Sequence, residues 1–553
     1  MNDREFNLLD ERWIRVIRPD CSEEEVSLID ALVNAHEYQD LSGEILVQDV
    51  AVLRMMLAVM HRVLSSVDEN GDDAPLETVD DALFRWDTIW HMGHLPEQAI
   101  REYLDKWHER FWLFHPERPF YQVNEAAIGT ENQAFKLNGE LSQSNNKARL
   151  FTMCAGKDKE CMSYSEAARW LIYLNGFDDT SAKPKGKNLP TPGIGWLGKL
   201  GLITAVGNNL FETLMLNMVL LPDGFHLWKT PEMPCWELDT PRVGERVQIG
   251  MPNNAAGLLT LQSRRILLKR DEGKVVGYTL LGGDFFPKED ALLEQMTVWT
   301  NIKDKKGTHQ HYQPRRHDMT RQMWRDFGSI LSYEEDTPRP GVVKWVTLLK
   351  KAKILPQNDR ICFRIASVQY GDKDFFVTNV FGDQLTFSTE LLTEAGATAY
   401  DYVINEVKLC EKAAYIIGKL YNNLCSAAGH RSKEKKTRKD NSYYVKEQFF
   451  DSIDAPFRRW LSELAPNADR NDLLDYCEKW HSEVKQIAKA QGKLMAELAG
   501  EKAFAGCTVE VEENDIKVKY HFSAPEAYNW FLGGLNNIYP EKTAGMQEVN
   551  TNG

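Results

Sequence analysis

The stretch VINEVKLCEKAAYIIGKL, residues 403–420, does most to decide the fold. Its apolar side chains recur every three or four residues, at Val403, Val407, Cys410, Ala414, Ile417 and Leu420. That spacing places them on one face of an α-helix. Because an amphipathic helix needs partners to cover its apolar face, the stretch predicts a helical bundle.

Three further segments near the C-terminal end supply those partners. Two carry apolar stripes with the same spacing, at Phe449, Phe450, Ile453, Phe457, Trp460 and Leu464, and at Leu473, Cys477, Trp480, Val484, Ile487 and Leu494. The third begins with Ser-Ala-Pro-Glu at 523–526, a sequence typical of a capped helix start. Residues 388–553 are therefore predicted to form a four-helix bundle.

The first 387 residues have a different pattern. Beyond residue 201, strand-like runs dominate at 201–206, 257–268, 275–281 and 360–368. Helical segments, such as 48–64, accompany them without a regular βαβ alternation. We therefore expect an α+β fold: a large mixed α/β N-terminal domain, residues 1–387, followed by the bundle.

Composition and charge exclude several classes of protein. The 553 residues are 43% hydrophobic and 27% charged, as in ordinary globular proteins. No apolar run approaches the roughly 18 residues of a membrane span, and the N-terminus has no signal-peptide pattern, so we expect a cytoplasmic protein without membrane association. The nine cysteines include no C-x-x-C pair, which favours reduced thiols. A net charge of −15 argues against a DNA-coating protein but allows local contact with nucleic acid.

Residues 193–198 read GIGWLG, a literal G-x-G-x-x-G. A dinucleotide site needs a strand before this motif and a helix after it. Here Pro190 and Pro192 come before the glycines, and residues 202–206 after them look like a strand. A loop whose backbone comes close to something else fits better. It is either an ordinary turn or, as the neighbouring lysines favour, a phosphate contact. A dinucleotide-dependent enzyme that uses residues 193–198 is the first alternative.

Two other segments are candidates for binding. Residues 124–160 are rich in amides and lack periodicity, which is typical of a long functional or disordered loop. Lysines and arginines crowd residues 303–325, as in a solvated loop or a nucleic-acid contact. The histidines and aspartate of 309–318 suggest a metal-dependent nuclease as the second alternative. Because we find no complete ligand set and no Walker A, G-x-S-x-G or H-E-x-x-H motif, we expect no enzyme, cofactor or metal. The basic strand 262–270 is interpreted as a sheet edge or a solvated face.

Several segments together resemble the CasA family, the large subunit of the type I-E CRISPR Cascade surveillance complex. They are FNLLDERWIRV at 6–16, FHPERPFYQ at 114–122, LMLNMVLLP at 214–222 and QSRRI at 262–266. Their order and spacing match the family over most of the chain. The resemblance implies a non-catalytic subunit that recognises a short motif beside the target (the PAM) in duplex DNA, helps to start unwinding and guide-RNA pairing, and recruits a helicase-nuclease. Its partners would be the other Cascade subunits, the guide RNA (crRNA), target double-stranded DNA at the PAM and that helicase-nuclease.

The resemblance also assigns binding residues. The family uses an asparagine-bearing loop near the RNA handle, a glycine loop, a lysine finger and a wedge hairpin that enters the minor groove. The lysine finger corresponds to Lys274 or Lys288. In the wedge, Lys373 or Asp374 stands where the family has glutamine. Some relatives carry two C-x-x-C pairs that look zinc-binding; this chain has neither, so we expect no zinc. The predicted nucleic-acid-binding residues are Asn145, Asn146, Lys147, Arg149, Gly193, Gly195, Gly198, Lys199, Lys373 and Asp374.

Overall fold

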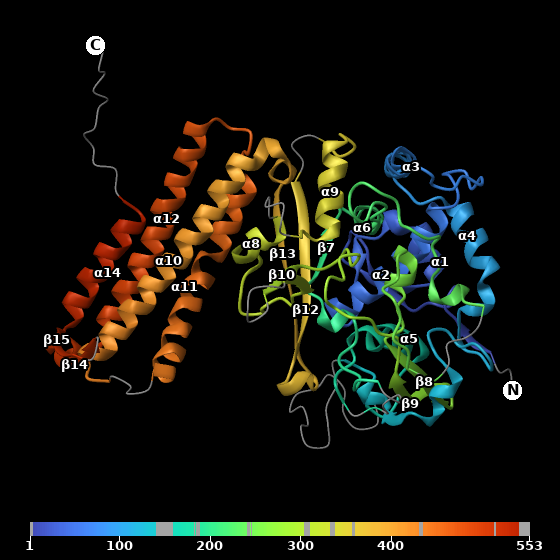
Figure 1. Cartoon of the computed structure of the whole chain (residues 1–553), viewed down its shortest axis with the longest axis horizontal. Coiled ribbons are helices and arrows are strands. Elements are labelled where there is room, and N and C mark those ends of the chain that lie inside the picture. The colour runs from blue at the N-terminus through green and yellow to red at the C-terminus, as the bar shows by residue number, and fades with distance from the viewer. Residues whose placement is uncertain are drawn as a thin grey trace, which may run out of the picture. The chain divides into compact units, whose positions relative to one another are not determined.

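The computed structural model describes residues 4–139, 159–181, 183, 189–239, 244, 246–303, 310–331, 338–356, 360–430, 435–513 and 516–540. The chain divides into two compact units, whose residues can be located along the chain with the colour bar of Figure 1. The first unit consists of Met1–Met323, Gly328–Gln357 and Ile361–Leu385, and the second of Trp324–Phe327, Asn358–Arg360 and Thr386–Gly553. Mixed helices and strands fill the first unit and long helices dominate the second, which confirms the predicted α+β fold with a helical C-terminal region.

Helix α2 (Leu46–Leu64) lies at the core of the first unit. Almost all of its side chains are buried, because its sequence is apolar on nearly every face. It packs against α5 and α7, and the first of these ends beside the candidate site. The other helices before residue 386 are α1 (Leu28–Val33), α3 (Val79–Met92), α4 (Glu97–Lys106), α5 (Tyr164–Phe177), α6 (Leu210–Asn217), α7 (Ala255–Leu259), α8 (Phe327–Leu331) and α9 (Gly341–Lys351).

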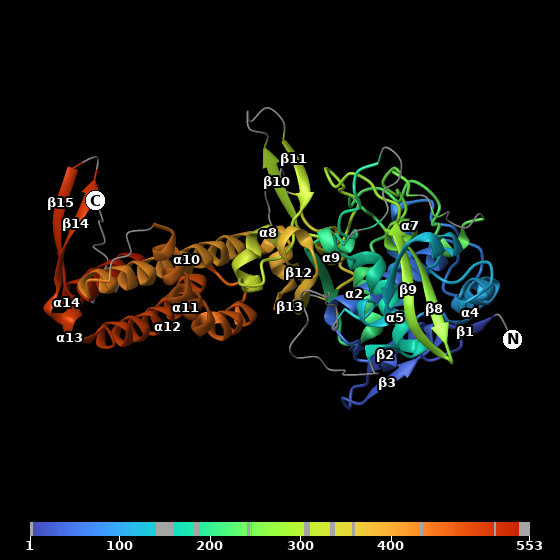
Figure 2. The same ribbon diagram turned by 90° about the horizontal axis from the view of Figure 1, so that it is seen from below.

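The strands of the first unit form several small sheets. Their orders are β1 (Glu5–Asn7)–β5 (Trp112–Phe114), β3 (Glu23–Val26)–β2 (Ile14–Ile17)–β4 (Asp40–Leu41), β6 (Thr130–Gln133)–β9 (Lys274–Gly282)–β8 (Arg264–Asp271), β13 (Val377–Ser388)–β12 (Arg360–Tyr370)–β7 (Leu202–Val206), and β10 (Trp299–Lys303)–β11 (Gln310–Pro314). Strands β8 and β9 pair antiparallel, as do β10 and β11, and both hairpins are visible in Figure 2.

The strand predicted at 257–268 is wrong in its first half. Residues Ala255–Leu259 form helix α7, because the side chain of Asn254 caps the amide of Gly257 over 2.7 Å. Strand β8 begins only at Arg264.

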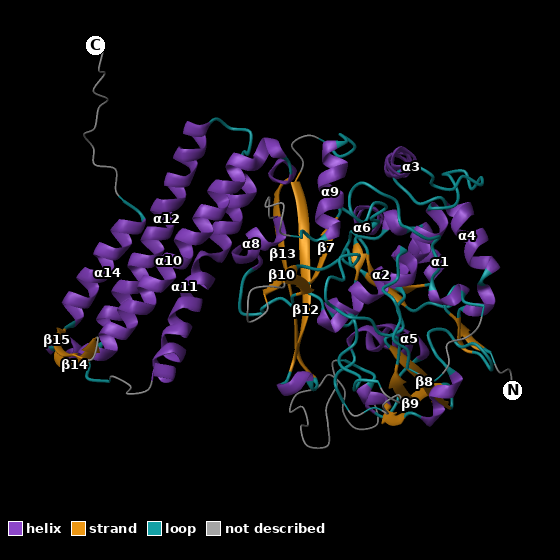
Figure 3. Cartoon of the chain, in the orientation of Figure 1, coloured by secondary structure: helices purple, strands orange, loops and turns teal. Residues whose placement is uncertain are grey.

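Four long helices make up most of the second unit, shown in purple in Figure 3: α10 (Ala397–Ala427), α11 (Lys435–Glu463), α12 (Arg470–Glu497) and α14 (Ala524–Ile538). The predicted apolar stripes are largely buried, although Leu494 is 56% exposed. Helix α13 (Gly500–Ala505) and the hairpin of β14 (Cys507–Glu513) and β15 (Ile516–Phe522) precede α14 and were not predicted. Trp324 joins this core from far away in sequence and stacks on Phe457, with 4.1 Å between ring centroids.

Candidate nucleic-acid interface

The glycine loop, residues 193–199, leads into strand β7, and its glycines differ in their surroundings. A side-chain carbon on Gly195 would come closer than 3.0 Å to the carbonyl oxygen of Gly176, which belongs to helix α5. The amide of Gly195 also donates to the carbonyl of Asp178 over 2.9 Å. Gly193, by contrast, is exposed and has open space where a side chain would be. Gly193 is therefore the residue whose backbone another molecule can approach.

Gly198 brings the glycine loop against the hairpin of β12 and β13. A side-chain carbon on Gly198 would overlap the hydroxyl group of Tyr370, the last residue of β12. The same hydroxyl donates to the carbonyl of Phe177, at the end of α5, over 2.6 Å. The glycine loop, helix α5 and this hairpin thus meet at one place.

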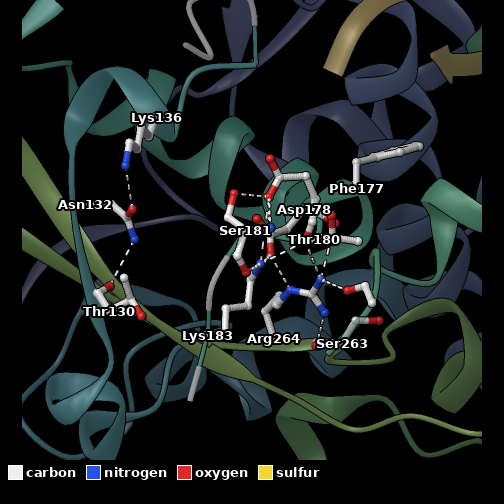
Figure 4. A network of polar contacts seen from close by, with 12 residues as sticks. Thr130, Asn132, Lys136, Phe177, Asp178, Thr180, Ser181, Lys183, Ser263 and Arg264 are labelled. Atoms are coloured by element: carbon white, nitrogen blue, oxygen red, sulfur yellow. Dashed lines mark hydrogen bonds and ion pairs between the residues drawn. The ribbon is translucent and has the colours of Figure 1, made fainter. Parts of the chain in front are cut away.

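A buried ionic network holds the glycine loop in place. Figure 4 shows Arg264, Asp178 and Lys183 pointing toward one another. The guanidinium of Arg264 donates to the carbonyl of Gly193 over 2.5 Å and to the Asp178 carboxylate. The ammonium of Lys183 lies 2.9 Å from that carboxylate. Strand β8 therefore holds the end of α5 and the loop through a single arginine.

Burial and charge act in opposite directions on this network. Burial raises the pKa of Asp178, but the charges of Lys183 and Arg264 outweigh it and hold that pKa below its ordinary value. Burial is the main cause of a lowered pKa for Lys183, and the nearby Asp178 opposes it. Asp178 is ionised at neutral pH and pairs with both Arg264 and Lys183, so its role is to hold structure.

The tip of the β12–β13 hairpin is conformationally strained. Lys373, Asp374 and Phe376 have φ values of 57°, 58° and 60°, in the left-handed region that residues other than glycine rarely adopt. Asp374 pairs with Arg316 at 2.9 Å. The side chain of Lys373 is exposed and has no ion-pair partner among the described residues. Strain of this kind clusters at functional sites.

Three cations near the glycine loop, Lys199, Arg246 and Lys288, form what we call the basic cluster. None of them pairs with a carboxylate in the part of the chain that the structure describes. Burial, with the positive charges of Arg264, Lys288 and Arg246, lowers the pKa of Lys199 to about 8, and Glu289 opposes this effect only weakly. Because a bound anion would relieve the repulsion, the basic cluster is suited to contact a phosphate.

The structure describes some of the predicted site residues and not others. Gly195, Gly198, Lys199, Lys373 and Asp374 lie with Gly193 around the loop and the hairpin. Asn145, Asn146, Lys147 and Arg149 lie outside the described residues. Of the two alternatives for the lysine finger, Lys288 is close enough to Lys199 to lower its pKa, and Lys274 is not among the charges that do so.

Sequence reasoning missed the residues that hold the site together. The basic strand 262–270 was interpreted as a sheet edge or a solvated face. Strand β8 is an edge strand of its sheet, but Arg264 and Arg265 are only 4% and 1% exposed. Arg265 pairs with Asp284 at 2.5 Å. Adjacent strand residues point to opposite faces, so a double arginine on a strand could have signalled that at least one is buried and paired.

The geometry supports neither enzymatic alternative. The glycine motif leads into a short 3-10 turn, Leu197–Lys199, and then strand β7, where a dinucleotide site needs a helix. His317 is buried and its Nε2 lies 3.0 Å from the carbonyl of Leu202, and His309 lies outside the described residues. Within the described ranges, no three His, Cys, Asp or Glu side chains are grouped as metal ligands would be.

The family model described as CRISPR-associated protein Cse1 matches residues 7–491 of the chain. The chain belongs to the Cse1 family. A curated relative, the CRISPR-associated protein CasA/Cse1 of Thermus thermophilus, is 31% identical over 336 residues, which are 59% of this chain and 60% of that relative. The chain thus matches about three fifths of the length of this curated relative.

Solved structures extend the likeness over nearly the whole chain. The crystal structure of Thermobifida fusca Cse1 matches with a TM-score of 0.81 and 27% identity, over 97% of this chain and 98% of that one. A chain of a CRISPR RNA-guided surveillance complex matches with a TM-score of 0.61 over 96% and 99%. At 17% identity the second match shows the fold alone. No helix in the described part of the chain is long and apolar enough to cross a membrane.

Proposed function

We propose that this chain is the large, non-catalytic subunit of a type I-E CRISPR Cascade complex. It recognises the PAM in duplex DNA, helps to start unwinding and guide-RNA pairing, and recruits the helicase-nuclease. Membership of the Cse1 family supports this proposal, as does the fold shared with a chain of an RNA-guided surveillance complex. Its partners are the other Cascade subunits, the crRNA and target duplex DNA, and it works in the cytoplasm without a membrane.

The observation that carries the proposal is the basic cluster beside the exposed backbone of Gly193. The whole chain carries a net charge of −15, so cations gathered at one place without a carboxylate partner among the described residues are a local exception. DNA phosphates are the anions that such a cluster would attract, and a bare glycine backbone can approach base edges where a side chain would collide. The two features together favour contact with a duplex at the PAM.

The β12–β13 hairpin is the proposed wedge. The hairpin meets the glycine loop at Tyr370, and its strained tip presents the exposed Lys373. A hairpin inserted at a base step can unstack it, and the displaced strands then become available for pairing with the guide. In this proposal the predicted loop of Asn145, Asn146, Lys147 and Arg149 contributes further contacts near the RNA handle.

The direct test uses the complex assembled with its guide RNA, on duplexes with correct and scrambled PAMs. Gly193→Val adds a side chain at an open position, so it should leave the fold intact and weaken PAM-dependent binding roughly 5- to 150-fold. Lys199→Ala should weaken binding to all duplexes alike and reduce the salt slope by about 0.9. Lys106→Ala, an exposed lysine of helix α4 outside the basic cluster, is the matched control.

Two results would contradict the assignment. The first is full PAM discrimination in Gly193→Val, and the second is an unchanged salt slope in Lys199→Ala. The non-catalytic part of the proposal has its own test, because the pure chain should neither cut DNA nor hydrolyse ATP. Turnover that follows the chain through a sizing column would overturn that part.

A further inference from the structure

Asp179 and Thr180, which follow helix α5, bond directly to the strained hairpin tip. The hydroxyl of Thr180 donates to the carbonyl of Lys373 over 2.8 Å, and its amide donates to the carbonyl of Asp374 over 3.2 Å. The carboxylate of Asp179 accepts the amide of Phe376 over 2.9 Å. We call Asp179 and Thr180 the latch. It binds the tip at each of its three left-handed residues.

The three latch hydrogen bonds are made to the residues whose left-handed backbone conformations are costly. Each non-glycine residue in the left-handed region costs on the order of 1–3 kcal/mol and persists only where its surroundings impose it. Two of the three latch contacts are made to carbonyls of Lys373 and Asp374, so they depend on the backbone direction that the unusual φ values set. Without the latch, the tip would lose three of the hydrogen bonds that oppose its relaxation to ordinary turn conformations.

The latch is anchored in the network that holds the glycine loop. Lys183 donates to the carbonyl of Asp179 over 2.8 Å, and Arg264 donates to the carbonyls of Asp178 and Asp179 over 3.2 and 3.3 Å. The same guanidinium holds the carbonyl of Gly193. Figure 4 shows Thr180, Lys183 and Arg264 gathered around Asp178. One buried network thus positions both the loop and the support of the hairpin tip.

We propose that Asp179 and Thr180 are positioning residues that hold the hairpin tip in the shape that opens the duplex next to the PAM. Through Arg264 they keep that tip in a fixed position relative to the glycine loop, so that DNA seated on the loop meets the wedge at one base step. This inference rests on the proposed function, because it assigns a task to residues that would not themselves touch DNA.

The test separates opening from binding. In the assembled complex, opening is followed with 2-aminopurine placed in the target beside the PAM, and affinity is measured on a duplex whose first base pairs are already mismatched. Thr180→Val keeps the shape and the amide but removes the hydroxyl, so PAM-dependent opening should slow roughly 3- to 10-fold. Affinity for the pre-opened duplex should stay within about twofold of wild type. Thr180→Ser restores the hydroxyl and should restore opening.

Thr378→Val is the matched control, because its hydroxyl bonds within the same hairpin, to the carbonyl of Gln369 over 3.0 Å, and does not reach the latch. It should open the duplex as wild type does. The inference is overturned if Thr180→Val opens the duplex at the wild-type rate, or if it loses affinity equally on the pre-opened duplex, as a merely structural defect would. If wild type itself shows no PAM-dependent opening, the proposed function fails, which is a distinct result.

Discussion

Replacing Gly195 with alanine should destabilise the first unit, while the same change at Gly193 should not. At Gly195 the added carbon would lie inside 3.0 Å of the carbonyl group of Gly176 and 3.1 Å from the carbonyl oxygen of Asn175. All of these are backbone atoms of helix α5, which cannot rotate away as a side chain could. Crowding of this kind costs about 1–3 kcal/mol. At Gly193 nothing lies within 4 Å, and neither glycine has a positive φ that would exclude alanine.

The assay is urea unfolding of the purified chain, followed by tryptophan fluorescence. Gly193→Ala should lie within about 0.5 kcal/mol of wild type, or above it by up to about 1 kcal/mol, because alanine restricts the unfolded chain. Gly195→Ala should unfold at lower urea with an unchanged slope. Equal stability of the two variants would refute the conclusion that Gly195 serves internal packing and that Gly193 alone is open to DNA.

Three further predictions concern charge and the amide-rich loop. Asp178→Asn should cost about 3–5 kcal/mol of unfolding free energy in urea titrations, because it leaves two buried cations without their shared carboxylate. Since the folded pKa of Asp178 is lowered, its contribution to the stability of the fold is present above about pH 4 and is lost as pH falls through the folded pKa. The stability of the variant should therefore depend less on acid pH than that of wild type. DNA affinity should fall as pH rises through about 8, where Lys199 loses its proton, and Lys199→Arg should abolish this fall in fluorescence-anisotropy titrations. Identical pH profiles for wild type and Lys199→Arg would contradict this prediction. The triple change of Asn145, Asn146 and Lys147 to alanine should impair complex assembly or target binding in gel-shift assays, and full retention of both would remove that loop from the interface.

Local patterns predicted the helices well and the contacts between distant segments poorly. The stripe from Val403 to Leu420 follows from the geometry of one helix, so its spacing is enough to predict it. The pairing of Arg264 with Asp178 joins residues 86 positions apart. Nothing in a single sequence states which buried carboxylate a given arginine will meet, and so the ionic network was missed.

The glycine motif shows the same limit at the candidate site. The sequence predicted a close approach of backbone to something else at Gly193, Gly195 and Gly198. It could not show that the partner of Gly195 is helix α5 and that of Gly198 is Tyr370. Only the three-dimensional placement of these segments separates a glycine that packs internally from one that is open to a ligand.

The most direct test of the account is the selection of a PAM by the complex with and without this chain. Complexes assembled around one guide RNA are bound to duplexes in which the bases beside a matched target are randomised, and the bound fraction is sequenced. The complete complex should enrich one short motif, and the complex that lacks this chain should enrich none. Enrichment of the same motif without the chain would show that another subunit reads the DNA, and would contradict the central claim.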